Sequence, residues 1–295
     1  MSIVATCAAA STALKSLQLS PRRNGGDRTN RKHIREVPLR LLSNRPSVES
    51  PVVEHPVVER QGIVFRIASR RKELYSALNL VYEAYVYSGL IETNHFEVRV
   101  TPFHALPTTE VLVAEHGSDV ICTMSLVRDG TLGLPMENIY ATEIERRRRQ
   151  GKHLAEVSCL ADDRESCDHS FSVVSRLMAL TAQCAKCRGV DELVIAVHPR
   201  HAGFYQRFLA FEPIGEVKAY GAVLDNPAVA LVMDLNRLQL EHPQAHKRLF
   251  GRAFSEEIVC YRPISATLRT ELRFLASQTY NTDHSDEAVK FLESA

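Results

Sequence analysis

The sequence predicts a mixed α/β protein with one central sheet and helices on its faces, and three observations support this fold class. Short apolar runs alternate with amphipathic helical patterns between residues 62 and 236. The run from Lys152 to Asp162 is apolar enough to be buried on both faces, as the central strand of a sheet must be. Beyond residue 236 the alternation stops, and the chain indicates two or three helices broken by Pro243 and Pro263.

Composition divides the chain into three parts. Hydrophobic residues make up 45% of the 295, enough for a substantial core. Residues 1–60 contain no aromatic residue and hold 10 Lys and Arg against 5 Asp and Glu, so we expect a disordered basic arm. Whether this arm is a targeting segment is left open. We expect a catalytic domain over residues 61–236 and a helical extension over 237–295.

Cysteine content and hydropathy indicate the redox compartment of the protein and whether it spans a membrane. Its seven cysteines have no regular spacing, which suits a reducing compartment, and we expect a cytoplasmic protein. No apolar run is long enough to span a membrane. We expect no metal site and no nucleic-acid partner.

The first half of the domain begins with a strand and a helix. Ile63, Phe65 and Ile67 alternate as in a half-buried strand. The following helix has apolar residues on one face and ends at Gly89. Residues 109–127 then indicate two strands joined by a turn at 116–119.

The second half is built around the central strand. A polar helix, 141–150, precedes it and carries four consecutive arginines, Arg146 to Arg149. An amphipathic helix from Phe171 ends at Gly189, and a buried strand follows at 192–197. A short helix opens at His198-Pro199, and two last strands are expected near residues 212–223 and 229–235.

Glu156 and Ser158 interrupt the apolar central strand. Side chains two residues apart in a strand point to the same face, so both should share one cavity. Burial raises the pKa of a carboxyl group, which suits a general base that works near neutral pH. The alternative is an edge strand whose Glu faces water.

Three stretches give the chain a family resemblance over roughly residues 62–236. The stretches are Val81-Tyr82-Glu83-Ala84-Tyr85-Val86 with Gly89-Leu90; Gly133-Leu134-Pro135-Met136 through Glu143 to the Arg146 run and Glu156-Val157-Ser158; and His198-Pro199-Arg200-His201 through Phe204-Tyr205 to Phe211-Glu212-Pro213-Ile214-Gly215 and Pro227-Ala228-Val229. In these stretches the chain resembles the long-chain N-acyl amino acid synthases of the FeeM type, which are similar to acyl-homoserine-lactone synthases. The lactone synthases have Glu-x-Ser-Arg-Phe on this strand, and Cys159 and Leu160 depart from that pattern.

The resemblance implies a GNAT-like acyltransferase fold. In such folds the central strand and its neighbour splay apart and leave backbone N–H groups free to bind a thioester carbonyl. Enzymes that use coenzyme A carry a glycine-rich turn after this strand, and its N–H groups cradle the pyrophosphate. Here residues 162–168 contain no glycine and four acids. We therefore expect no separate cofactor, with the acyl group carried on the phosphopantetheine of acyl carrier protein.

Further candidates follow from position in that fold. Tyr205 and His198 are candidate acid or base groups, although a core aromatic and a turn-ordering His are the alternatives. Arg99 and Arg128 are candidates for binding an amino-acid carboxylate. Cys159 and Leu160 are candidate substrate contacts. Arg146 and Arg149 lie three residues apart on one helix face and are candidates for docking the acidic carrier protein, against the alternative of a solvated face.

The sequence thus predicts an N-acyltransferase that moves a fatty acyl group from acyl carrier protein to the α-amino group of an amino acid. Glu156 would accept the proton of the ammonium group, and Ser158 would orient the thioester. Two alternatives are an acyl-homoserine-lactone synthase and a catalytically silent acyl-binding module.

Overall fold

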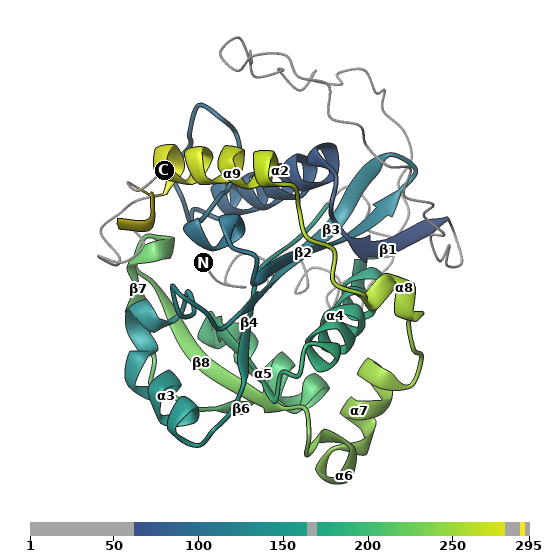
Figure 1. The fold of residues 1–295 in the computed structure, drawn as a ribbon. Coiled ribbons are helices and arrows are strands. Elements are labelled where there is room, and N and C mark those ends of the chain that lie inside the picture. The colour runs from purple at the N-terminus through teal and green to yellow at the C-terminus, as the bar shows by residue number, and fades with distance from the viewer. Residues whose placement is uncertain (1–61, 164–169, 281–289, 293–295) are drawn as a thin grey trace, which may run out of the picture.

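One mixed sheet organises the protein (Figure 1). The computed structural model describes residues 62–163, 170–280 and 290–292, so the arm at 1–60 and most of the turn at 162–168 lie outside the described residues. The strand order is β1-β2-β3-β4-β5-β8-β6, with β7 beside β8, and the predicted α/β class is confirmed. The strands are β1 (Ile63–Ile67), β2 (Thr109–His116), β3 (Asp119–Arg128), β4 (Leu154–Asp162), β5 (Glu192–Val197), β6 (Glu212–Pro213), β7 (Lys218–Tyr220) and β8 (Asn226–Asp234).

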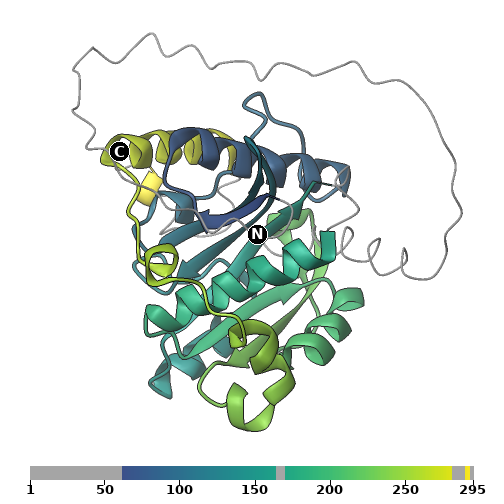
Figure 2. The same cartoon turned by 90° about the vertical axis from the view of Figure 1, so that its right-hand side faces the viewer.

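Helices cover both faces of the sheet (Figures 1 and 2). One face packs against α2 (Arg71–Tyr87), the short helix η1 (Pro102–Ala105) and α3 (Glu137–Arg149). The other packs against α4 (Ser170–Cys187), α5 (Pro199–Leu209), α6 (Leu238–Glu241), α7 (Pro243–Phe250) and α8 (Glu256–Val259). Two elements complete the described fold, the short helix η2 (Gly221–Val223) and α9 (Ala266–Thr279). No helix in the described ranges is long and apolar enough to cross a membrane.

Strand β4 lies between β3 and β5, and all nine of its residues are buried. The expected interior strand is confirmed, and the edge-strand alternative for Glu156 is wrong. Strand β4 pairs in parallel with β5 only from Leu154↔Glu192 to Glu156↔Val194, although both strands continue. From Val157 onward β4 pairs with β3 alone among the described strands. The two central strands therefore splay apart just after Glu156.

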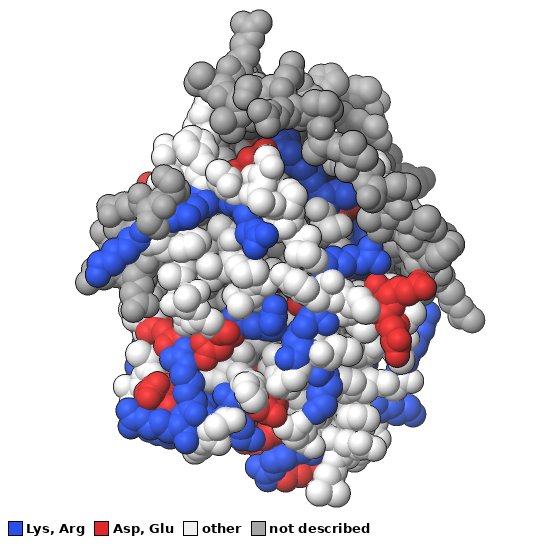
Figure 3. All heavy atoms as spheres, viewed as in Figure 1, with Lys and Arg blue, Asp and Glu red and all other residues white. Residues whose placement is uncertain are grey.

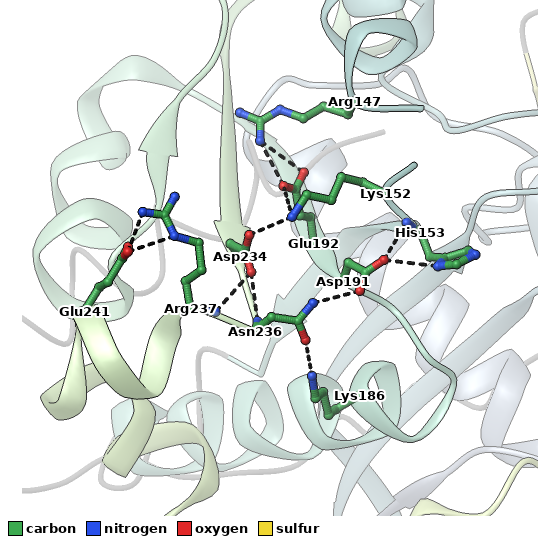
Figure 4. A network of polar contacts seen from close by, with 10 residues as sticks. All are labelled: Arg147, Lys152, His153, Lys186, Asp191, Glu192, Asp234, Asn236, Arg237 and Glu241. Atoms are coloured by element: carbon green, nitrogen blue, oxygen red, sulfur yellow. Dashed lines mark hydrogen bonds and ion pairs between the residues drawn. The ribbon is translucent and has the colours of Figure 1, made fainter. Parts of the chain in front are cut away.

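A polar network fixes β4 and β5 at the opposite end of their pairing (Figure 4). Lys152 donates to Asp234 at 2.9 Å and lies 3.5 Å from Glu192, which Arg147 also contacts at 3.0 Å. The backbone N–H of His153 donates to Asp191 at 2.9 Å. These contacts join the start of β4 to the start of β5 and the end of β8, so the splay opens from a fixed end.

A bulge bends β4 in the part that no longer pairs with β5. Thr123 pairs with Ala161 and Ser125 with Ser158, so β4 has one residue more than β3 between these pairs. Cys159 has a φ of +51°, a left-handed conformation that non-glycine residues rarely adopt. Bulges of this kind bend a strand and redirect its side chains. The pattern of apolar residues in β4 gives no sign of it.

Two predicted elements need correction. The strand expected at 212–223 is interrupted, and only β6 and β7 form. Tyr140 explains the break, because its hydroxyl donates to the carbonyls of Glu216 and Ala228 at 2.8 and 2.7 Å. A Cβ at Gly215 would lie 2.7 Å from the ring of Tyr140, so the chain passes close around that ring. The polar helix expected at 141–150 forms the part of α3 after a kink at Tyr140, whose φ and ψ of −126° and 32° are not helical, and an additional turn from Glu137 precedes that kink.

The C-terminal helices join several parts of the molecule. Helix α7 packs on α4, and α9 packs on α2 and η1. Helices α2 and α9 run side by side in both views (Figures 1 and 2), where Arg71 contacts Glu271 at 2.8 Å. The division of the chain into a domain and an extension stays a prediction.

Candidate active site

Glu156 is the centre of the site. Its side chain is 0% exposed, on the face of β4 that α2 and α3 cover. One carboxylate oxygen, Oε2, accepts the backbone N–H of Met136 at 2.7 Å, and Oε1 has no partner among the described residues. Burial raises the pKa of Glu156 to about 7, although the Met136 N–H favours the anion. A base with this pKa is half deprotonated at neutral pH.

The loop that supplies Met136 is held by a carboxylate and arginine cluster. Glu137 Oε1 accepts the backbone N–H of Leu134 at 2.6 Å. Arg148 binds both oxygens of Glu137 and donates to both oxygens of Asp129, at 2.7 and 2.8 Å. Sequence reasoning missed this cluster, because its members are remote in the chain and look like ordinary surface charges.

Gly133 permits the tight approach within this loop. Its φ is +64°, and a Cβ there would lie 2.3 Å from Oε1 of Glu137. Any side chain would therefore displace the carboxylate that orients the loop. The stretch Gly133-Leu134-Pro135-Met136, which carried part of the family resemblance, brings an N–H group to Glu156.

Ser158 shares the face of Glu156, and a second serine lies opposite it. Ser125 of β3 is its cross-strand partner. The Nδ1 atom of His104 accepts the backbone N–H of Thr101 at 3.0 Å, and its Nε2 lies 3.2 Å from Ser125 Oγ. Burial lowers the pKa of His104 to about 3, so the ring is neutral and its one proton is on Nε2. Ser125 Oγ accepts a hydrogen bond from this N–H group, and its own hydroxyl hydrogen is left to donate.

Arg99 is a buried cation beside this face. It lies between α2 and η1 with only 4% of its surface exposed, and its backbone N–H donates to Leu78. No hydrogen bond or ion pair joins its guanidinium to any residue that the structure describes. Its Cζ lies 5.7 Å from the ring centre of Tyr280, and burial lowers its pKa despite the nearby Cys159, Tyr280, Tyr85 and Tyr220.

Arg128 does not lie on the Glu156 face of the sheet. It follows Val127, which pairs with Glu156, and so points to the other face of β3. It is half-buried, donates to the carbonyl of Pro107 at 3.3 Å, and lies 5.6 Å from the ring centre of Tyr261. The structure thus separates the two arginines that the sequence nominates for one carboxylate.

The remaining candidates occupy different places. Tyr205 is buried in the core on the opposite face, with Val157 and Leu160, and its ring packs against Phe211 at 5.9 Å. His198 lies after β5 and caps α5, where Nδ1 accepts the N–H of Arg200 at 3.2 Å. Cys159 lies on the Glu156 side, in the cluster with Tyr85. The catalytic roles of Tyr205 and His198 stay predictions.

The four arginines at the end of α3 have two different environments. Arg147 pairs with Glu192, and Arg148 with Asp129 and Glu137, so both are part of the structure. Arg146 and Arg149 are exposed, and Arg149 contacts Glu145 at 2.9 Å. Basic spheres gather, with acidic ones among them, where Figure 1 draws α3 (Figure 3). This pair lies near the fixed end of β4 and β5, not at the splayed end.

Comparison with known proteins gives one family. The model of the family "N-acyl amino acid synthase FeeM" matches residues 76–234, more than half of the chain. Comparison with curated proteins finds no match.

Among solved structures, the N-acyl amino acid synthase FeeM from uncultured soil microbes is 29% identical and covers 62% of this chain and 97% of its own, with a TM-score of 0.55. The AHL synthase LasI is 18% identical, covering 66% of this chain and 98% of its own with a TM-score of 0.48. ElaA from Escherichia coli is 12% identical, covering 58% and 99% with a TM-score of 0.40.

The sheet that splays after β4, the buried Glu156 and the family match agree with one another. The fold is the expected GNAT-like one, and the chain is an acyltransferase that belongs to the FeeM N-acyl amino acid synthase family.

Proposed function

We propose that this acyltransferase moves a long-chain fatty acyl group from the thioester of acyl carrier protein to the α-amino group of an amino acid. The observation that carries the proposal is Glu156, which is fully buried, has a pKa of about 7 and keeps Oε1 without a partner among the described residues. Such a carboxylate has one oxygen fixed by Met136 and the other available to a substrate.

The reaction needs a base because only the neutral amine attacks a thioester. Glu156 Oε1 accepts a proton from the α-ammonium group, and the nitrogen lone pair forms the new C–N bond. The C–S bond then breaks, and the departing thiolate takes the second proton that the nitrogen loses, so that the products are an amide and a free thiol. Ser158 and the unpaired edge of β4 support the thioester carbonyl and the oxyanion that forms on it.

Arg99 would bind the carboxylate of the acceptor. A cation buried without a counter-ion is unfavourable in the free protein, and an anionic substrate group relieves that penalty on binding. Arg99 and Glu156 both lie beside Tyr85, Cys159, Tyr220 and Tyr280. We therefore assign the carboxylate of the amino acid to Arg99 and its ammonium group to Glu156.

The carrier protein is the proposed donor because the end of β4 is unsuited to coenzyme A. Asp162 and Asp163 stand where a pyrophosphate would approach, and phosphate is repelled by such carboxylates. Exposed Arg146 and Arg149 are the proposed docking pair for the acidic carrier. Their place near the fixed end of β4 requires a partner that covers α3 while its prosthetic arm reaches the site.

The test is acyl transfer with purified components. The protein is incubated with fatty acyl carrier protein and a mixture of amino acids, and N-acyl amino acids are identified by mass spectrometry. We expect free thiol to be released only when an amine is present. Thiol release without an amine, or no acylated product with any amino acid, would contradict the proposal.

A further inference from the structure

The C-terminal helices add a residue to the site from outside the region that matches the family model. That model ends at residue 234, whereas Tyr280 directly follows α9. Tyr280 is 7% exposed and belongs to the core cluster that surrounds the Glu156 face of the sheet. The last helix therefore takes part in building the site and does not only cover the surface.

Helix α9, which carries Tyr280 at its end, is held by contacts on two sides. Leu272 and Leu275 are buried against Leu78 and Val100. On the other side, Glu271 accepts hydrogen bonds from Arg71 and from the hydroxyl of Tyr75, at 2.8 and 3.3 Å. The loop that carries Arg99 packs in the same cluster, since Val98 and Val100 flank it.

Tyr280 contacts both ends of the proposed acceptor site. Its ring lies over Arg99, with the ring centre 5.7 Å from Cζ. Asn138, in the first turn of α3 and two residues after the Met136 that binds Glu156, is a polar neighbour of Tyr280 and lines a pocket with it. The ring therefore spans from the buried cation to the helix that positions the base.

A large pocket lies against Tyr280. It has a volume of about 920 Å³, within the range of small-molecule sites, and its lining includes Phe103, Leu134, Asn138, Leu154 and Tyr280. Neither Arg99 nor Glu156 is part of this lining. Tyr280 thus faces both Arg99 and the pocket.

We propose that Tyr280 is the wall of the acceptor site and selects the acceptor by the size of its side chain. A substrate with its carboxylate at Arg99 and its amine at Glu156 would direct its side chain toward this ring or past it into the pocket. The part of the inference that concerns selection of the acceptor rests on the proposed function. The part that concerns the shielding of Arg99 by Tyr280 rests on the structure alone.

Measuring acceptor selectivity tests the proposal that Tyr280 selects the acceptor by the size of its side chain. We compare kcat/KM for glycine and for phenylalanine, with one acyl carrier protein donor, in wild type, Tyr280→Ala, Tyr280→Phe and Phe274→Ala. Phe274 is the matched control, because it is an exposed aromatic residue on the same helix. Pocket changes of this size alter selectivity by about 10- to 200-fold.

We expect Tyr280→Ala to raise the ratio of phenylalanine to glycine at least about tenfold. Tyr280→Phe and Phe274→Ala should keep the wild-type ratio. If Tyr280 had a purely structural role, its loss would lower kcat/KM for glycine and for phenylalanine by the same factor. An unchanged ratio of the two kcat/KM values therefore overturns the proposal. If Tyr280→Ala does not fold, Tyr280→Leu serves the same comparison.

Chemical labelling of Arg99 tests the wall without any turnover. Phenylglyoxal modifies accessible arginines, and peptide mass spectrometry measures its rate at each site. We expect Tyr280→Ala to accelerate the labelling of Arg99 relative to Arg128, which already lines the pocket. If the labelling rate of Arg99 relative to Arg128 is the same in wild type and in Tyr280→Ala, the proposal that Tyr280 shields Arg99 is overturned. If the labelling of Arg99 is faster in Tyr280→Ala but the wild-type protein acylates no amino acid, the proposed function is contradicted and the shielding of Arg99 by Tyr280 is supported.

Discussion

Replacing Arg99 by Met should raise the stability of the protein and at the same time lower its kcat/KM for amino-acid acceptors. In the free protein the guanidinium is buried at 4% exposure with no hydrogen bond or ion pair to the described residues. Leaving a buried polar group unsatisfied costs about 1–3 kcal/mol, and more for a charge. Met has a similar length and no charge. We therefore expect the melting temperature of Arg99→Met to rise by about 2–4 °C for each kcal/mol recovered.

The loss of chemistry should be specific for the acceptor carboxylate. Removing one partner of a buried charge pair costs about 2–5 kcal/mol, which is roughly a 30- to 5,000-fold loss in kcat/KM. Phenethylamine differs from phenylalanine only in lacking the carboxylate, so its kcat/KM should change little in Arg99→Met. The ratio of kcat/KM for phenylalanine to that for phenethylamine should fall toward one in Arg99→Met.

The comparison variant is Arg128→Met, which tests the other nominated arginine. Arg128 points away from the face of Glu156, so the ratio should keep its wild-type value. Two results would refute the reasoning about Arg99. The first is an equal loss for the acid and the amine, and the second is a lower melting temperature, which would show that Arg99 stabilises the free protein.

Three further predictions follow from the same geometry. The pKa of Glu156 is about 7 in the fold against 4.5 in the unfolded chain, so its stability contribution is complete below pH 4.5 and falls by roughly 3 kcal/mol as the pH rises through 7. Thermal denaturation should therefore show Glu156→Gln gaining stability over wild type between pH 5 and 8, and a constant difference would contradict the burial of a titrating carboxyl. Acyl carrier protein should give a far higher kcat/KM than coenzyme A with the same acyl chain, and equal values would reject the donor assignment. Reversing Arg146 and Arg149 to Glu should raise the KM for the carrier protein and flatten its salt dependence, since exposed charges are screened over about 8 Å at physiological ionic strength; an unchanged KM and salt slope would leave the pair as a solvated face.

Local patterns were sufficient to predict the central strand and its carboxylate. The apolar run around Glu156 favoured a strand covered on both faces over an edge strand, and the structure buries all nine residues of β4. The hairpin of β2 and β3 and the helix α4 followed in the same way from alternation and amphipathic spacing. In each case the signal lies within about ten to twenty neighbouring residues.

The rest of the site depends on contacts between distant segments. His104 meets Ser125 across 21 residues, and Arg148 meets Asp129 across 19. Tyr280 reaches Arg99 from the far end of the chain. Arg99 and Arg128 look equivalent in sequence, and only the fold distinguishes them, because Arg99 is buried in the loop after α2 whereas Arg128 points to the other face of β3. The interruption between β6 and β7 likewise follows from Tyr140, some 75 residues earlier.

The central claim is that Glu156 removes the proton from the attacking amine, and the turnover of Glu156→Gln tests it most directly. The amide keeps the size of the side chain and one oxygen for the Met136 N–H, so the fold and the loop should remain. With saturating acyl carrier protein and an amino acid acceptor at pH 7, we predict that turnover falls by about 10²- to 10⁴-fold while the melting temperature is kept or raised. A folded Glu156→Gln protein with turnover near that of wild type would contradict the claim.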